Sequence, residues 1–267
     1  MNKKILVTVK TYPSLSNKYG ELVCTAGMTE DGEWIRIYPV PFRKIDYYER
    51  YHKYQWIELD LKRNTSDFRP ESFRPIDYTK IICGEKIKAD GKSWSKRRKL
   101  ILRKVYYDMN LLISEAKNKD LCTSLATFKP AKITGFVIEK DSRNWDEKKL
   151  AQFKQGDLFD RKDFKTVEKI PYKFFYKFND VEGKKSKLMI EDWEVGQLYL
   201  NCLKRHSGNE EKACSDVRKK YFDDFAKTKD IYLFLGTTQT HHYVSLNPFI
   251  IIGIFNPKYE SRQKTLL

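Results

Sequence analysis

The chain has 267 residues, with 52 Lys and Arg against 36 Asp and Glu, so its formal net charge is +16. A hydrophobic fraction of 40% at this length supports a real core in one large or two small domains. Because the charge is spread along the whole chain, it does not come from a disordered basic tail. Because 17 Tyr, 16 Phe and 5 Trp accompany the basic residues, the composition favours a partner that offers phosphates and unpaired bases.

The five cysteines show no CxxC spacing, which argues against a disulfide framework and a zinc cluster. The first residues lack the apolar stretch of a signal peptide. The longest apolar run, residues 249–254, is too short to span a bilayer. We therefore expect a cytoplasmic protein with reduced thiols, no disulfides, no metal, no cofactor and no membrane partner.

Residues 1–91 are predicted to form an OB-like β-barrel domain. Their β-branched and alternating segments are separated by turn signals at hairpin spacing, which suits a small barrel. The expected strands are residues 5–12, 22–28, 33–40, 56–61 and 81–87. Residues 42–54 are expected to hold a short helix, and residues 63–78, with two Arg-Pro pairs, are expected to form an ordered loop.

Residues 92–160 are predicted to be a basic helical connector with one strand. A helix is expected to begin near Ser93 or Ser95, and from Leu102 to Ala116 apolar residues recur every three or four positions, which indicates an amphipathic helix. A strand is expected at residues 133–138, and the charged segment 145–159 is the candidate domain boundary.

Residues 161–267 are predicted to be a C-terminal α/β domain, which makes the whole chain an α+β protein. Its expected strands and helices follow in chain order, and residues 260–267 are expected to be a loose end. The strands are residues 170–178, 186–190, 231–236 and 249–255, and the helices are residues 192–205 and 209–225. The hairpin at 170–190 could supply a second barrel, and an internal duplication is conceivable.

Strand alternation places Trp34, Arg36 and Tyr38 on one face of the third predicted strand, with Ile35 and Ile37 on the other. Two flat rings around a guanidinium can stack bases and pair a phosphate. Lys10 and Tyr12 on the first strand would extend this platform. In the alternative, the rings pack under a covering element and Arg36 pairs with a carboxylate.

The opening of the chain resembles that of dual OB-domain proteins. The resemblance covers residues 4–40 and lies in a Lys-bearing first strand, in Leu22-Val-Cys-Thr-Ala-Gly27 and in Gly32-Glu-Trp-Ile-Arg36. The sequence departs from the pattern after Arg36, where it continues Ile-Tyr-Pro-Val-Pro. The resemblance implies a nucleic-acid-binding β-barrel and no catalytic residue.

A run of seven basic residues without an acid extends from Lys92 to Lys104. Within it the predicted phosphate contacts are Lys96, Arg97, Lys99 and Arg103, and Lys96, Lys99 and Arg103 would share one face of a helix. A face without carboxylates favours phosphate contact. The alternative is an ordinary solvated helix face.

A polar loop at residues 237–243 separates two apolar strands, and such loops often carry sites. Its ligand candidates are Thr237, Gln239, His241 and His242. Adjacent histidines on an extended loop point apart, so a shared metal is not expected. An ordinary hairpin loop is the alternative.

Glu58, Asp60 and Lys62 share a face of the fourth predicted strand, with Asp46 upstream. This pattern resembles the acid-x-Lys core of restriction-type nucleases, which implies Mg²⁺-assisted phosphodiester cleavage. A solvated strand face is the alternative. The chain contains no P-loop, GxGxxG, GxSxG or HExxH motif.

The prediction is therefore a non-catalytic nucleic-acid-binding protein that uses a basic helix for phosphates and an aromatic and arginine strand face for bases. The predicted partner is a nucleic acid, DNA or RNA. Two other readings stay open: a Mg²⁺-dependent nuclease, and a protein-binding subunit of a larger nucleic-acid-processing complex.

Overall fold

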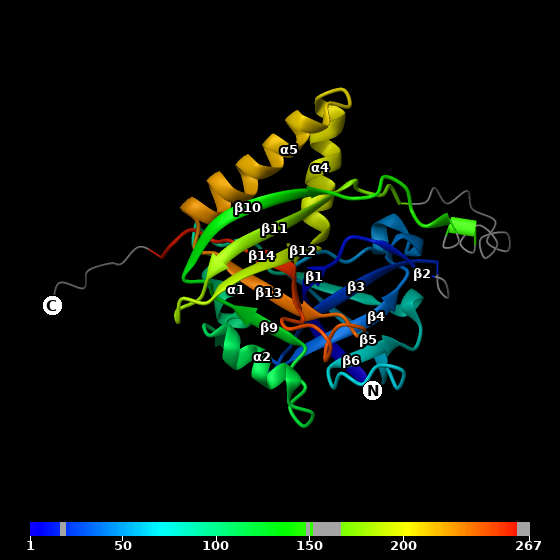
Figure 1. Ribbon diagram of the computed structural model, residues 1–267. Coiled ribbons are helices and arrows are strands. Elements are labelled where there is room, and N and C mark those ends of the chain that lie inside the picture. The colour runs from blue at the N-terminus through cyan, green and yellow to red at the C-terminus, as the bar shows by residue number, and fades with distance from the viewer. Residues whose placement is uncertain (17–19, 148–149, 152–166, 261–267) are drawn as a thin grey trace.

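The computed structural model describes residues 1–16, 20–147, 150–151 and 167–260, and it contains two β-sheets that pack against each other (Figure 1). The first sheet is built from the N-terminal part of the chain. Its strands are β1 (Asn2–Lys10), β2 (Ser14–Ser16), β3 (Gly20–Thr29), β4 (Trp34–Val40), β5 (Gln55–Arg63), β6 (Ser72–Pro75) and β7 (Ile82–Lys86).

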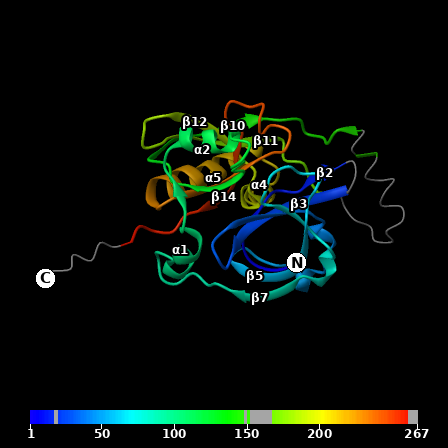
Figure 2. The same cartoon turned by 90° about the horizontal axis from the view of Figure 1, so that it is seen from below.

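Strands β1, β3, β4, β6 and β5 are neighbours in that order, and β1 also pairs with β5, so these five strands close into a barrel. Figure 2 looks toward this ring of strands. Only β4 and β6 run parallel among the pairs of the ring. This strand order is that of the OB fold, so the predicted OB-like barrel is confirmed.

Alternation along the strands explains why the barrel closes around an apolar core. On β5 the side chains of Ile57, Leu59 and Leu61 are buried, while the charged residues between them are exposed. Strand β6 was not expected, because it lies inside the segment 63–78 that the sequence marks as a loop. It supplies the link between β4 and β5 without which the ring would stay open.

The second sheet contains β8 (Val105–Tyr106), β9 (Leu125–Phe128), β10 (Lys132–Lys140), β11 (Tyr172–Asn179), β12 (Lys185–Ile190), β13 (Tyr232–Thr237) and β14 (Phe249–Phe255). Their order is β10-β11-β12-β14-β13-β9-β8, and β12 runs parallel to β14. Pro130, which cannot donate a ladder hydrogen bond, separates β9 from β10. If β9 and β10 are taken as one bent strand, this sheet repeats the strand order of the first barrel.

Helices cover the second barrel. Between its third and fourth strands lie α4 (Trp193–Arg205), which Asp192 caps, and α5 (Glu210–Arg218), which Asn209 caps. The chain continues from α5 as a π-helical stretch over residues 219–226. Both helices lie over the curved sheet of β10, β11 and β12 (Figure 1). The predicted α+β class is confirmed.

The single helix expected from about residue 93 to residue 116 is in fact two helices. Helix α1 (Ser95–Ile101) ends before β8, and α2 (Met109–Lys117) begins at its cap Asp108. The predicted helix at 42–54 consists of two short 3₁₀ turns. Most of the predicted boundary segment 145–159, and the end of the chain from residue 261, lie outside the described residues.

A shared hydrophobic cluster joins the two barrels. Leu6, Val9 and Met28 of the first barrel pack in one cluster with Phe234 and Phe255 of the second. We call this contact between the two barrels the seam. A buried ion pair crosses it, with Lys53 Nζ 3.1 Å from Asp192 Oδ2. The contact fixes the orientation of the two barrels and of everything that lies between them.

Candidate functional site

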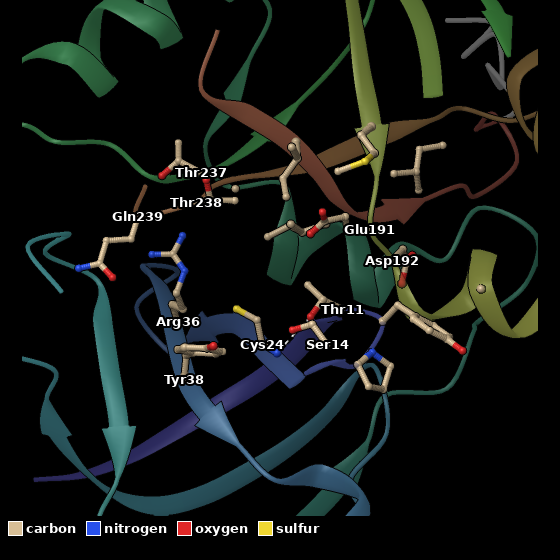
Figure 3. A pocket seen from close by; sticks show the side chains of 18 of the residues that line it. Thr11, Ser14, Cys24, Arg36, Tyr38, Glu191, Asp192, Thr237, Thr238 and Gln239 are labelled. Carbon is tan, nitrogen blue, oxygen red and sulfur yellow. Dashed lines mark hydrogen bonds between the residues drawn. The ribbon is translucent and has the colours of Figure 1, made fainter. Parts of the chain in front are cut away.

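A cavity of about 650 Å³ lies between the two barrels (Figure 3). Both barrels line it with residues at the ends of their strands and in adjoining loops. The first barrel contributes Thr11, Tyr12, Pro13, Ser14, Cys24, Arg36, Tyr38, Pro39, Asn64, Ser66, Asp67, Arg69 and Arg74. The second barrel contributes, among others, Asp141, Lys169, Tyr172, Lys173, Met189, Glu191, Asp192, Thr237, Thr238, Gln239, Ile250 and Ile252.

These lining segments occupy corresponding places in the two barrels. OB folds bind oligonucleotides on their second and third strands and on the loops between strands one and two and between strands four and five. In the first barrel those elements are β3, β4 and the described parts of the two connections, residues 11–16 and 64–71. In the second they are β11, β12 and the described residues 141–147, 167–171 and 238–248. The cavity is therefore the place where two OB faces meet.

Arg69 anchors the loop that follows β5. Its Nε and Nη2 donate to the two carboxylate oxygens of Asp67 at 2.8 Å and 2.6 Å, and its Nη1 donates to the carbonyl of Thr237 on the second barrel. Although burial acts the other way, hydrogen bonds from Arg69 and Ser72 lower the pKa of Asp67 to about 2. This bidentate pair holds the loop against the other barrel.

Arg36 crosses the seam in the same way. Its Nη1 donates to Ser124 Oγ at 2.8 Å and its Nη2 donates to the Ser124 carbonyl at 3.1 Å. Glu71 accepts hydrogen bonds from the Ser124 backbone N–H and from its hydroxyl, which fixes the serine in turn. Burial, followed by the charge of Arg69, lowers the pKa of Arg36.

Several polar groups of the cavity lack a partner within the described part of the chain. The Nε of Arg74 and the hydroxyl of Thr238 are buried without a hydrogen bond. The basic side chains of Lys169 and Lys173, in contrast, lie 3.0 Å and 3.3 Å from the carboxylate oxygens of Asp141. The lining thus combines ion pairs at Asp141 with two buried polar atoms that have no partner.

Glu191 is held by backbone hydrogen bonds from both barrels. Its N–H donates to the carbonyl of Ile251 at 2.8 Å, and its carbonyl accepts from the N–H of Tyr12 at 2.9 Å. Its side chain points into the cavity (Figure 3), and its carboxylate forms no hydrogen bond or ion pair with the residues that the structure describes. Burial raises the pKa of Glu191, and nearby Lys173 opposes this.

The predicted strand face is divided between this cavity and the seam. Arg36 and Tyr38 line the cavity, whereas Trp34 is half-buried with its ring 5.4 Å from that of Phe234 in an edge-on contact. The second barrel covers part of the Trp34 ring, which is the alternative in which the rings pack under a covering element. Ile35 and Ile37 lie in the barrel core as expected.

Lys10 and Tyr12 do not extend this face in one piece. Tyr12 lines the cavity, but Lys10 lies in an aromatic enclosure, with its Nζ 4.4 Å from the ring centre of Phe42 and 5.5 Å from that of Trp193. Burial, followed by the nearby charge of Lys53, lowers the pKa of Lys10 to about 8. The enclosure binds the ammonium group by cation–π contacts.

The basic run is only partly helical and only partly exposed. Lys96 and Lys99 are exposed on α1, but Arg103 lies beyond the end of the helix, so the three residues do not share one helix face as expected. Arg97 is buried, with its guanidinium 3.9 Å from the ring centre of Tyr54, and its Nε donates to the carbonyl of Ile87. The basic run therefore presents exposed cations to solvent, while its buried Arg97 packs inside the protein.

The polar loop is built around a buried histidine. His242 Nε2 donates to the carbonyl of Ala116 at 2.7 Å, which leaves Nδ1 to accept from Thr237 Oγ1 at 2.8 Å. Burial lowers the pKa of His242, so the neutral ring fits this position. Thr237 and Gln239 line the cavity, whereas His241 is exposed.

The acid-x-Lys residues lie on the outside of the first barrel. Glu58, Asp60 and Lys62 are exposed on β5, and Asp46 is exposed before a 3₁₀ turn. Within the described ranges there is no group of three or more His, Cys, Asp or Glu residues that could hold a metal ion.

All five cysteines are free thiols. In the part of the chain that the structure describes, no helix has the length and apolarity needed to cross a membrane.

Sequence reasoning missed Glu191, Arg69 and Arg74. The two arginines belong to the Arg-Pro pairs of residues 63–78, a segment whose lack of periodicity led to its interpretation as a plain loop. Glu191 directly follows a predicted strand, and a carboxylate at a strand end is a weak signal that many surface residues share.

Comparisons with known proteins were made for the whole chain. The family model described as Domain of unknown function (DUF8758) matches residues 1–103, and that described as Domain of unknown function (DUF8757) matches residues 105–267. A search of curated protein sequences finds no match.

Two of the solved structures that match the chain have low sequence identity and low TM-scores. One, a murine DNA binding protein bound with ds DNA, is 10% identical over 97% of this chain and 96% of the other, with a TM-score of 0.34. The second, the tetrameric p202 HIN2, is 8% identical over 97% of this chain and 92% of the other, with a TM-score of 0.30.

Proposed function

The chain belongs to the family described as Domain of unknown function (DUF8757), and from its cavity we propose that it is a nucleic-acid-binding protein that catalyses no reaction. The observation that carries this proposal is the meeting of two OB faces around one cavity. Both barrels offer it the strands and loops that take oligonucleotides in this fold. The arrangement suits a single strand that passes between the barrels.

The size of the cavity favours unpaired nucleotides. A volume of about 650 Å³ lies within the range of about 300–1,000 Å³ that is usual for small-ligand pockets, whereas a duplex needs an open groove. Tyr12, Tyr38 and Tyr172 among the lining residues can present ring faces to bases. Bases would therefore enter the cavity, and the strand backbone would lie along its rim.

The exposed cations outside the cavity would attract the phosphate backbone. Lys96, Lys99 and Arg103 are exposed, and their side chains have no ion pair among the residues described. A cation that no carboxylate pairs can contact a phosphate and release the counterions bound to it. We therefore retain these three residues as proposed phosphate contacts, and we assign Arg97 to the support of α1.

The test is a binding titration of the full chain against single- and double-stranded DNA and RNA at two salt concentrations. We expect single strands to bind more tightly than duplexes. The triple change Lys96→Gln, Lys99→Gln and Arg103→Gln should flatten the log–log salt dependence by about two units, since each phosphate contact contributes about 0.7–0.9. The matched control is Lys132→Gln, Lys185→Gln and Lys219→Gln, which removes the same charge from exposed sites of the second barrel.

The cavity itself is tested by obstruction. Ser14 is exposed and lines the cavity, so Ser14→Trp should fill its mouth without disturbing the core and should weaken binding about tenfold or more. Ser215→Trp, at an exposed position of α5, is the matched control. Equal affinity of both variants would show that the cavity is not part of the binding site. If wild-type protein binds none of the four polymers, the proposed function is wrong.

A further inference from the structure

Glu191 offers an acceptor pair that no protein group uses. It is a half-buried carboxylate in the cavity, and within the described residues it has neither an ion pair nor a side-chain hydrogen bond. Its residue is half-buried and lines the cavity, so a ligand in that space can reach the carboxylate oxygens. A ligand with two N–H donors would use both acceptors.

The backbone holds this carboxylate in a fixed place. The N–H of Glu191 is bonded to Ile251 on β14 and its carbonyl to Tyr12 of the first barrel, so the residue is tied to both barrels whatever its side chain does. Figure 3 shows Glu191 and Arg36 on opposite sides of the cavity. A planar ligand between them would meet acceptors on one side and, on the other, the positive charge of Arg36, whose two Nη atoms already donate to Ser124.

The chemistry of the two sides selects one nucleobase. An ionised carboxylate is acceptor-only, with two oxygens that can take two parallel N–H donors. On its Watson–Crick edge only guanine presents two adjacent donors, N1–H and the 2-amino group, whereas the other bases place an acceptor beside each donor. A cationic guanidinium ligand would present similar donors, but Arg36, Arg69 and Arg74 in the lining disfavour it.

The walls between these groups suit the faces of a base. Met189, Ile250 and Ile252 line the cavity beside Glu191, and apolar contact above and below an unstacked base replaces the stacking that it loses. Arg74 and Thr238 also line this space.

Resting on the proposed function, we propose that the cavity between the barrels is a guanine-binding subsite in which the Glu191 carboxylate accepts from N1–H and the 2-amino group. The prediction is a preference for single strands that contain guanine. Glu191 is then a specificity-determining residue, and it is separate from the phosphate contacts.

The experiment measures fluorescence anisotropy of a short labelled oligothymidylate with one central guanine, hypoxanthine or adenine. We expect the guanine strand to bind about tenfold more tightly than the adenine strand, with hypoxanthine, which lacks the 2-amino group, between them. Glu191→Gln should reduce the guanine preference to about twofold or less, because its amide nitrogen faces a donor. Glu58→Gln, on the exposed face of β5, is the matched control.

Separate outcomes identify which proposal fails. Salt-dependent binding with no preference among the three strands, or a preference that Glu191→Gln leaves intact, overturns the guanine subsite and leaves nucleic-acid binding standing. Free GMP is the second probe: GMP binding that needs Glu191, without binding of any strand, refutes the proposed function and keeps the subsite. If neither GMP nor any strand binds, both are wrong. Thermal melting of Glu191→Gln checks that the variant is folded.

Discussion

Trp34 gives the most direct test of how the two barrels are joined. Full removal of a core tryptophan costs about 3–5 kcal/mol, and Trp34 is half-buried, so Trp34→Ala should lower the free energy of unfolding by about 2–3 kcal/mol. The edge-on contact with Phe234, with ring centres 5.4 Å apart, accounts for part of this loss. Aromatic pairs of this kind contribute about 0.5–1.5 kcal/mol beyond area burial.

The assay is a double-mutant cycle of Trp34→Ala and Phe234→Leu, read by denaturant unfolding and by nucleic-acid binding of the folded variants. We expect a coupling energy of about 1 kcal/mol and unchanged affinity. Additive effects would show that the two rings do not stabilise the seam together. Normal stability with a binding loss of about 1–3 kcal/mol would instead make Trp34 a base-stacking residue and refute the argument.

Three further predictions concern other parts of the molecule. Because the pKa of Asp67 is lowered to about 2 in the folded chain, its stabilising effect should be complete above about pH 4 and should fade as pH falls towards 2; a stability difference between wild type and Asp67→Asn that stays constant over this range would contradict it. Asp60→Asn should leave nucleic-acid binding intact, and the wild type should show no Mg²⁺-dependent cleavage in a gel assay, since Asp60 is exposed and no metal-binding group is found among the described residues; cleavage that Asp60→Asn abolishes would establish the nuclease. Gly196→Ala should lower the melting temperature, because an added Cβ would lie 2.3 Å from Tyr12 Cδ2 and overpacking costs about 1–3 kcal/mol; unchanged melting would show that Tyr12 moves freely.

The first barrel could be predicted because its strands carry their own signal. On β5, buried Ile57, Leu59 and Leu61 alternate with charged residues, and the pattern alone gives the strand and its inner face. The second barrel was harder to predict, because Pro130 splits its first strand into β9 and β10, and each part is short. Strand β6 has no local signal at all: its place is set by its parallel pairing with β4, which is a tertiary interaction.

The site could be predicted only in part, since its residues come together only when the barrels dock. Strand alternation correctly places Arg36 and Tyr38 outside the core of the first barrel, but it cannot distinguish solvent from the face of another domain.

The same pattern therefore placed Trp34 on a base-stacking face with Arg36, although the second barrel covers part of that ring and leaves a cavity beside Arg36. Glu191 lies far along the chain from Arg36 and reaches the same cavity because Tyr12 and Ile251 hold its backbone between the barrels. An outward-facing polar residue in a chain with two barrels is thus a candidate for the space between them as much as for the surface. Variants on both sides of that space, at Ser14 and Glu191, are needed to decide its role.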